Sequence, residues 1–575
     1  MLLKKLLVAI ILLGICTKAH SQIKLQLKMS HADNNVINGI SVTYVLPQGY
    51  SDSKDKTILL FDKLTPLQRT RDTVFDLNAK DSSGLVKFHQ VKSKTINGND
   101  YSCLQADRSI TGPLQISYRV PLANPIPAQS GPVRDLQAAG DGISGSFGSF
   151  LLLPYTDKNM EIQLDWELPE KADAVCSYGP GKSVKFQTTF GDLLEAQFLA
   201  GKLSSFVSTN HPGGFSMYGL GKGSNSEFGD AANWSAKTYQ VIRDSLEGSP
   251  EKPFYYFFRS YDGPPLSSGR ATSGSFVLYV PTGTSLNDED IKSLSAHEMI
   301  HVFVADLYDP EGLADWYVEG IADYLSVKLL YDAGLISEKR YLELRNGELA
   351  EYYTNRLRNV PNQKIPQIMW SGRNAWTTPY TRGALYFADL EGKLRQHRVK
   401  KVSVLSLIRE MNGIKASGRQ TTVQTWADLI KKRAGDWAVA DFKLMMSGRL
   451  LIPVNNAYGE NFKRKPVAAQ FFDLGFDKPK AIKAGEVIAG LDPKSPAGLA
   501  GLKNGDTISS AINLIPAYES YTSAITITVK RKGIDFPITF QPRIGHVTGY
   551  KWFSVASGST RLKKHLYRRP KDQVH

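Results

Sequence analysis

Hydrophobic and polar residues alternate along several stretches of the first 210 residues. Residues 37–47 read Ile-Asn-Gly-Ile-Ser-Val-Thr-Tyr-Val-Leu-Pro, and residues 113–121 and 162–169 repeat this alternation. A period of two is typical of a strand that buries one of its faces. Clusters of glycine, asparagine, aspartate and serine separate these stretches, as turns between strands do. The pattern predicts a β-rich domain over residues 22–210, built as an antiparallel sandwich or a related sheet.

The pattern changes after about residue 215. Apolar spacing predicts a helix over residues 231–246 and buried strands at 254–258 and 275–280. Between these strands, residues 269–274 are rich in glycine and serine and are expected to form a loop. The remaining periodicities predict helices over residues 285–307, 313–326, 338–357, 380–398 and 425–447. Together these elements predict a mainly helical domain over residues 215–450.

The last part of the chain divides into three segments. Residues 453–466 are rich in lysine, arginine, proline and asparagine and are expected to be a linker. Residues 468–545 form a small separate module, and residues 546–575 form a basic tail. A chain of 575 residues with 42% hydrophobic and 22% charged residues is typical of several globular domains. The expected fold class is therefore multidomain α+β.

The first 21 residues have the parts of a secretory signal peptide. Two lysines precede an apolar run over residues 6–16, and small residues follow at the expected cleavage site. This run is too short to span a membrane, and no later segment has 18 uninterrupted apolar residues. The sequence therefore predicts an exported protein, periplasmic or secreted, with no transmembrane span.

Charge and cysteine content add two constraints. The formal net charge is +15, and removal of the signal peptide leaves +12. The basic residues are mostly dispersed and no nucleic-acid-binding motif is present, so no nucleic-acid partner is expected. Cys103 and Cys176 are the cysteines of the processed chain. In an exported protein they form either one disulfide or two buried thiols, and their spacing does not decide between these.

The clearest chemistry lies in the stretch His297-Glu298-Met-Ile-His301. On a helix, residues four apart lie one turn apart on the same face, so both imidazoles can reach one Zn²⁺. Glu298 lies about 100° round the helix, beside the metal, where it can act as the general base on a zinc-activated water. The alternative is an ordinary helix whose two histidines have structural partners.

A zinc site of this kind needs a third protein ligand and an open position. Glu319 follows His301 on the next predicted helix, and Asp323 lies one turn further along the same face. We expect Glu319 to be the third ligand and Asp323 to orient a ligand histidine through its second ring nitrogen. The apolar residues around Glu319 favour a buried, partnered carboxylate over a solvated one.

These residues resemble a known family. The motif around His297, followed by Trp316-Tyr-Val-Glu319-Gly-Ile-Ala-Asp-Tyr, is similar to the zinc motifs of the gluzincin (thermolysin-like) metallopeptidases. With a β-rich domain before it and a PDZ-like module behind it, the chain resembles the M61 glycyl aminopeptidase family. The resemblance implies a thermolysin-like fold over residues 215–450, one Zn²⁺ per chain, and a peptide or protein substrate.

The resemblance also bears on the substrate. The segment Tyr380-Thr-Arg-Gly-Ala-Leu is similar to the Tyr-x-Lys-Gly-Ala-Leu segment that supplies an oxyanion-stabilising tyrosine, so Tyr380 is the candidate donor. A purely structural tyrosine is the alternative. Family members often have a Gly-Gly-x-Glu-His stretch that helps to hold a free amino terminus, but residues 273–278 contain no glutamate. Peptide hydrolysis is therefore expected, with aminopeptidase or endopeptidase specificity left open.

The C-terminal module resembles a PDZ domain. Its loop Leu474-Gly475-Phe476 is similar to the loop whose backbone N–H groups hold the C-terminal carboxylate of a peptide. A structural cap with an unused groove is an equal alternative. Two further functions stay open for the whole chain. It could be an inactive, peptidase-like scaffold that binds peptides through the PDZ module, or a zinc hydrolase acting on another substrate.

Overall fold

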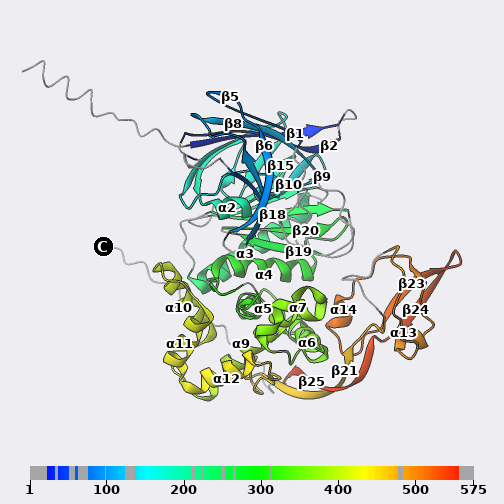
Figure 1. Ribbon diagram of the computed structural model, residues 1–575. Coiled ribbons are helices and arrows are strands. Elements are labelled where there is room, and N and C mark those ends of the chain that lie inside the picture. Colours follow the sequence, from blue (N-terminus) through cyan, green and yellow to red (C-terminus); the bar gives the residue numbers. More distant parts are fainter. Residues whose placement is uncertain are drawn as a thin grey trace, which may run out of the picture.

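The structure is a computed structural model that describes residues 22–555 (Figure 1), with gaps at residues 33–35, 49, 51–57, 63–74, 97–98, 123–135, 209–213, 222–224, 248–252, 263–266, 273, 311 and 477–483. The expected signal peptide and most of the expected basic tail lie outside the described residues. Among the described residues, no helix is both long and apolar enough to cross a membrane.

The N-terminal domain consists of three β-sheets and confirms the expected β-rich region. Burial alternates along β2 (Ile37–Leu46) and β8 (Leu114–Pro121), where the sequence predicted it, and along β1 (Gln22–His31) as well. Neighbouring strands are antiparallel except that β1 pairs in parallel with β11 (Met160–Glu167). Cys103 and Cys176 lie in this domain as buried free thiols, and burial raises the pKa of Cys176 to about 12.

The strand order in each of these sheets follows from the hydrogen-bond pairing. The seven-stranded sheet runs β14 (Ser183–Thr188), β11, β1, β2 (Ile37–Leu46), β8 (Leu114–Pro121), β4 (Phe75–Asp81), β5 (Gly84–Leu85). The five-stranded sheet runs β13 (Gly179–Pro180), β12 (Asp173–Cys176), β15 (Gln197–Gly201), β10 (Gly142–Ser146), β9 (Gln137–Ala139). The three-stranded sheet runs β3 (Ile58–Asp62), β7 (Asn99–Ala106), β6 (Phe88–Ile96), and the short helices η1 (Phe147–Ser149) and α2 (Phe190–Glu195) complete the domain.

The helical domain begins with a sheet that is covered on both faces. Its order is β16 (Ser204–Ser208), β17 (Phe215–Leu220), β18 (Phe254–Tyr261), β20 (Ser275–Pro281), β19 (Ser268–Thr272). Phe276 and Leu278 pack into the core of the helices, whereas Val277 and Tyr279 pack against the N-terminal domain. Because both faces are covered, β17 and β20 are buried along their whole length.

The helices follow below this sheet (Figure 1). In chain order they are α3 (Asn225–Leu246), α4 (Glu289–Phe303), α5 (Asp315–Asp332), α6 (Glu338–Thr354), η2 (Asn362–Lys364), α7 (Ile365–Ile368), η3 (Met369–Ser371), α8 (Arg373–Trp376), α9 (Thr378–Gln396), α10 (Val404–Ala416), α11 (Val423–Ala434) and α12 (Asp436–Met446). Two of these correspond to the single helix expected over residues 425–447. The chain breaks at Gly435, whose φ of 102° lies in the left-handed region that favours glycine.

Two expected irregular segments are strands in the structure. The glycine- and serine-rich segment expected as a loop contains β19, which pairs with β20 and owes its conformation to that neighbour rather than to its own β-propensity. The expected linker contains the first half of β21 (Phe462–Phe472), and β25 (Arg543–Ser554) extends into the expected basic tail. These two strands form a two-stranded ribbon whose exposed positions include Lys465 and Lys551.

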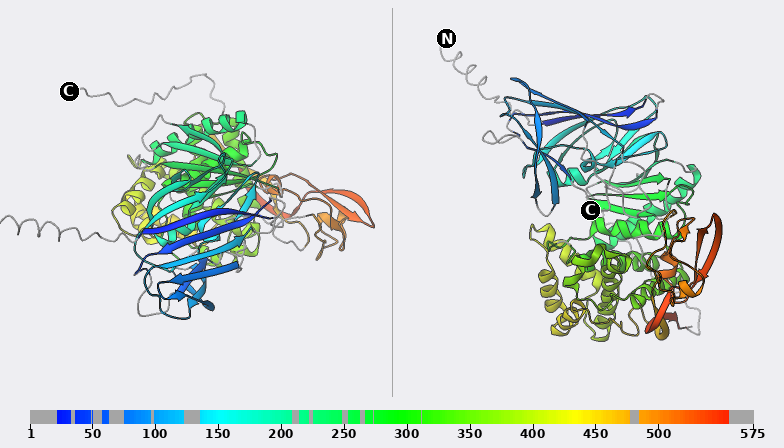
Figure 2. Two further views of the ribbon diagram at one scale, coloured as in Figure 1. Left: turned by 90° about the horizontal axis from the view of Figure 1, so that it is seen from above. Right: turned by 45° about the vertical axis from the view of Figure 1, so that its right-hand side comes forward.

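The C-terminal module projects from the side of the helical domain (Figure 2). It contains α13 (Pro496–Leu499), α14 (Ile515–Tyr518) and the sheet β22 (Thr507–Ile508), β23 (Ile525–Arg531), β24 (Ile534–Phe540). The ribbon packs on α6, where the Asn346 amide donates to the Trp552 carbonyl oxygen at 2.9 Å and accepts from its N–H at 2.8 Å. The ribbon that leads to the module is therefore attached to the helical domain by two hydrogen bonds between the Asn346 side chain and the Trp552 backbone.

Helices α5 and α9 cross in direct backbone contact. A Cβ atom added to Gly383 would lie 1.9 Å from the Trp316 carbonyl oxygen, and one added to Gly320 would lie 2.4 Å from the Cα of Gly383. Neither helix can yield by moving a side chain, because the clashing atoms belong to the backbone. Glycine at both positions therefore sets the distance between the two helices.

We predict that Gly383→Ala lowers the free energy of unfolding by about 3 kcal/mol or more, because overpacking here must separate two backbones. Gly413→Ala on α10 is the matched control, since its new methyl group would meet open space and alanine favours a helix by up to about 1 kcal/mol. Chemical denaturation of both variants measures the difference. Equal stability of the two variants would contradict this account of the helix crossing.

Candidate active site

Helix α4 carries the expected zinc motif and is fixed at both ends. The Asp288 carboxylate accepts a hydrogen bond from the Asp290 N–H at 2.8 Å and caps the first turn, where acidic residues suit the helix dipole. At the other end, the Asn412 amide from α10 donates to the Phe303 carbonyl oxygen at 2.7 Å. The helix therefore ends two residues after the motif, in a fixed position.

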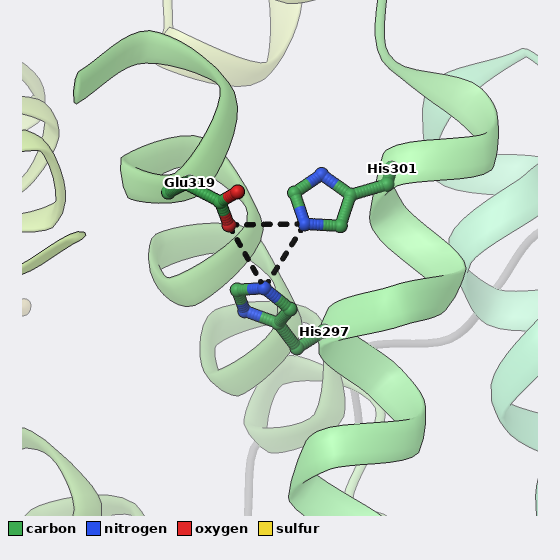
Figure 3. A group of neighbouring side chains, drawn as sticks. All are labelled: His297, His301 and Glu319. Atoms are coloured by element: carbon green, nitrogen blue, oxygen red, sulfur yellow. Dashed lines mark hydrogen bonds and ion pairs between the residues drawn. The ribbon is translucent and has the colours of Figure 1, made fainter. Parts of the chain in front are cut away.

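Three side chains from α4 and α5 converge on one point (Figure 3). The Nε2 atoms of His297 and His301 lie 3.0 Å apart, and each lies 3.2 Å from Oε2 of Glu319. These atoms form the only group of three or more potential metal ligands found among the described residues. The structure thus brings together the three ligands expected from the sequence.

The donor set and its spacing fit a tetrahedral Zn²⁺ site. Zinc–nitrogen and zinc–oxygen bonds of about 2.0–2.1 Å at tetrahedral angles place neighbouring ligand atoms about 3.3 Å apart, close to the 3.0 and 3.2 Å found here. Burial raises the pKa of Glu319, but the two histidines outweigh burial and hold its pKa well below the usual range. A carboxylate that stays ionised between two imidazoles is suited to a divalent cation.

Asp323 orients the first histidine. The Nδ1 atom of His297 lies 2.7 Å from Oδ1 of Asp323, which fixes Nε2 as the atom directed at the other two ligands. Burial lowers the pKa of His297, but Asp323 and Glu319 outweigh burial and raise it. Behind Asp323, the buried Arg345 on α6 donates to the carbonyl oxygens of Asp323 and Tyr324, which ties α6 to this turn of α5.

Glu298 lies against the edge of the sheet. Its side chain is 6% exposed, and a Cβ atom added to Gly269 of β19 would lie 2.4 Å from its Oε1 atom. Burial raises the pKa of Glu298, and His301 and His297 oppose that shift. The carboxyl group therefore sits beside the candidate ligands, in a space that the missing side chain of Gly269 leaves open.

Tyr380 stands in the first turn of α9, near His297. Its ring lies 6.0 Å from the ring of His297 at an angle of 12°, and Trp376 packs against it at 5.8 Å. Burial, together with Glu319 and Asp323, raises the pKa of Tyr380 well above its ordinary value, so its hydroxyl keeps its proton. Arg382, two residues further along α9, donates to the carbonyl oxygens of Arg358 and Val360.

Leu474, Gly475 and Phe476 lie in the C-terminal module, directly after β21. The Gly475 N–H donates to the Asp473 carboxylate at 2.7 Å, and the other oxygen of Asp473 pairs with Arg356 of the helical domain at 2.7 Å. This loop therefore binds a carboxylate of its own chain. Residues 477–483, which follow it, lie outside the described residues.

Sequence reasoning missed the residues of β19. Gly269 lies against Glu298, and the next residue, Arg270, pairs with Glu195 of the N-terminal domain. A glycine- and serine-rich stretch resembles a loop, and nothing local indicates that it pairs with β20. Of the stretch 273–278, which was compared with the family segment, residues 275–278 belong to β20.

No protein-family model and no curated protein matches this chain. Its fold is similar to that of an aminopeptidase N family protein from Idiomarina loihiensis, with a TM-score of 0.68 and 16% identity over 92% of this chain and 98% of that chain. An M1 zinc metallopeptidase from Deinococcus radiodurans gives a TM-score of 0.45 and 17% identity over 76% of this chain and 96% of that chain. The first likeness shows the fold alone, and the second is too low to carry an argument.

We predict that Asp323→Ala raises the dissociation constant for Zn²⁺ by about 10- to 100-fold, because His297 loses the acceptor that orients its ring. Competition with a chromophoric chelator measures this constant. Asp332→Ala is the matched control, since Asp332 lies on the same helix and pairs with Lys328 at the surface. Unchanged zinc affinity of the Asp323 variant would contradict the orienting role.

Proposed function

We propose that this protein is a zinc-dependent metallopeptidase of the M61 type. The convergence of His297, His301 and Glu319, with Glu298 beside them and Asp323 behind, is the observation that carries the proposal. The similar fold of an aminopeptidase N family protein supports it at the level of architecture. An inactive scaffold would need neither a third ligand nor an orienting carboxylate, so the assembled group favours the enzyme over that alternative.

In this proposal the three ligand side chains hold one Zn²⁺ per chain. Zinc, when bound, supplies a Lewis acid that polarises a peptide carbonyl and lowers the pKa of water. His297 and His301 bind through Nε2, and Asp323 keeps the His297 ring in the orientation that this requires. Glu319 contributes the carboxylate that makes the ligand set singly negative.

Glu298 moves the proton in the reaction. A water oxygen attacks the peptide carbonyl carbon while the Glu298 carboxylate takes the proton of that water. The carbon–nitrogen bond then breaks, and the same carboxyl group delivers the proton to the leaving amine nitrogen. The burial of Glu298 against Gly269 keeps bulk water from competing for this proton.

Tyr380 donates to the oxygen that becomes negative. Its position at the start of α9, stacked near the ring of His297, lets its hydroxyl stabilise the oxyanion of the tetrahedral intermediate. The raised pKa of the phenol keeps this donor protonated at neutral pH. Gly383 allows α9 to approach α5 closely enough to bring Tyr380 to the site.

We further propose that the chain is exported, on the basis of residues 1–21, and that the C-terminal module is PDZ-like. The proposed peptidase activity includes two possible specificities, that of an aminopeptidase and that of an endopeptidase. Because the Gly475 N–H is bonded to Asp473, a peptide carboxylate at the PDZ-like loop would have to displace an internal one. We therefore propose that the main role of the module is to support α6, and that peptide binding is secondary.

We predict that Glu298→Gln keeps one zinc per chain and loses at least about 10³-fold in kcat, since the amide cannot take a proton from water. Metal analysis and digestion of a peptide library, with products identified by mass spectrometry, test both halves together. Full peptidase activity in this variant would overturn the assignment. An absence of tightly bound zinc in the unmodified protein would overturn the proposed function itself.

Tyr380→Phe is predicted to lower kcat by about 10²-fold with little change in KM, because one oxyanion donor is lost. Steady-state kinetics on a single peptide provide the test. Tyr308→Phe serves as the control, because Tyr308 is 57% exposed and lies outside the site. If the two variants were equally active, Tyr380 would be a structural tyrosine.

A further inference from the structure

The backbone of β19 runs directly past the proposed catalytic glutamate. Within the part of the chain that the structure describes, β19 is the last strand of its sheet and has a hydrogen-bonded neighbour on one side, β20. The close approach of Gly269 to the Glu298 carboxyl group places this edge beside the proposed general base. A peptide reaching Glu298 therefore passes this strand.

Arg270 is the next residue of that strand, and its side chain extends to the opposite face of the sheet. Its Nε donates to Oε2 of Glu195 at 3.2 Å, and its Nη2 donates to the same oxygen. Glu195 is the last residue of α2, so the pair joins the edge strand to the N-terminal domain. Their side chains are 31% and 36% exposed, so a solute can reach the pair.

Arg270 is the charged residue of β19, and it follows Gly269, whose backbone lies against the Glu298 carboxyl group. The charged side chain that this strand brings next to the proposed general base is therefore a cation. A substrate ammonium group at this place would be repelled by Arg270, whereas a carboxylate would be attracted.

We propose that Arg270 is a specificity-determining residue that binds a carboxylate of the substrate next to the scissile bond. An extended peptide lying along the β19 edge alternates its side chains between the two faces of the sheet. When one residue presents its carbonyl to Glu298, its neighbour directs its side chain towards the face of Arg270. A guanidinium group fits a carboxylate with two parallel hydrogen bonds.

Glu195 limits the affinity of Arg270 for a substrate carboxylate. It holds the Nε–Nη2 edge of Arg270 in a fixed direction, and it competes with an incoming carboxylate for the positive charge. The substrate carboxylate could be an aspartate or glutamate side chain or the α-carboxylate of a peptide C-terminus, since the recognising chemistry is the same. The inference rests on the proposed peptidase function and names the substrate class of that site.

The experiment uses the full chain loaded with zinc and three peptides that differ only at a residue flanking the scissile bond, which is Glu, Gln or Lys. A fourth and fifth peptide compare a free C-terminal carboxylate with its amide at the same distance. We expect kcat/KM for the Glu peptide to exceed that for the Gln peptide by about five- to tenfold, the range for a partly exposed charged hydrogen bond. The Lys peptide should be the poorest substrate. The carboxylate–amide pair shows which source of carboxylate is used.

Four variants test whether Arg270 causes this preference. Arg270→Gln should abolish it, Arg270→Glu should reverse it in favour of the Lys peptide, and Arg270→Lys should restore part of it. Glu195→Gln should keep or increase it, because a competitor of the substrate carboxylate is removed. Arg433→Gln is the matched control, since Arg433 pairs with Glu410 on the exposed surface of other helices and should leave the preference unchanged.

Binding to the Glu298→Gln variant gives a second measurement that does not depend on turnover. Calorimetry should show the Glu peptide binding about five- to tenfold more tightly than the Gln peptide, and the added Arg270→Gln change should remove the difference. Equal binding of the two peptides, or a preference that survives Arg270→Gln, would overturn the inference. Hydrolysis that depends on zinc and Glu298 but ignores substrate charge would overturn it while leaving the proposed function intact.

Discussion

The backbone contact between α5 and α9 is the constraint on which the rest of the site depends. Gly320 and Gly383 let the two helices approach until a single methyl group would not fit between them. That approach brings Glu319, one residue before the first glycine, and Tyr380, three residues before the second, close to His297 of α4. The proposed ligand Glu319 and the proposed oxyanion donor therefore both depend on two residues that have no side chain.

A second constraint is the burial of the sheet β16–β17–β18–β20–β19 between the helices and the N-terminal domain. Its inner strands are covered by helices on one face and by the N-terminal domain on the other, so only its edge can meet a substrate. One of its two edge strands is β19, where Gly269 leaves room for the Glu298 carboxyl group and Arg270 reaches Glu195 across the domain boundary. The charge at this edge of the proposed site is thus set jointly by residues of two domains.

Much of the architecture could be predicted from local pattern. Alternation along β1 and β2 and the continuous apolar runs of β18 and β20 indicate strands directly, because burial on one or two faces leaves a period in the sequence. The position of β19 could not be predicted, since its conformation comes from pairing with β20. The break in the helix expected over residues 425–447 could not be predicted either, since a glycine ends a helix only where its φ angle is positive, as at Gly435.

The sequence by itself determined the candidate chemistry: His297, Glu298 and His301 share a helix turn, and the spacing of Glu319 and Asp323 places them one turn apart on the next helix. Those relations depend on the 3.6-residue period alone, which every helix obeys. Only the tertiary structure decided that the two helices bring three candidate ligand atoms within 3.2 Å of one another, and that Gly269 of β19 lies against Glu298. Such contacts join residues far apart in the chain, and no local periodicity encodes which distant surfaces will pack together.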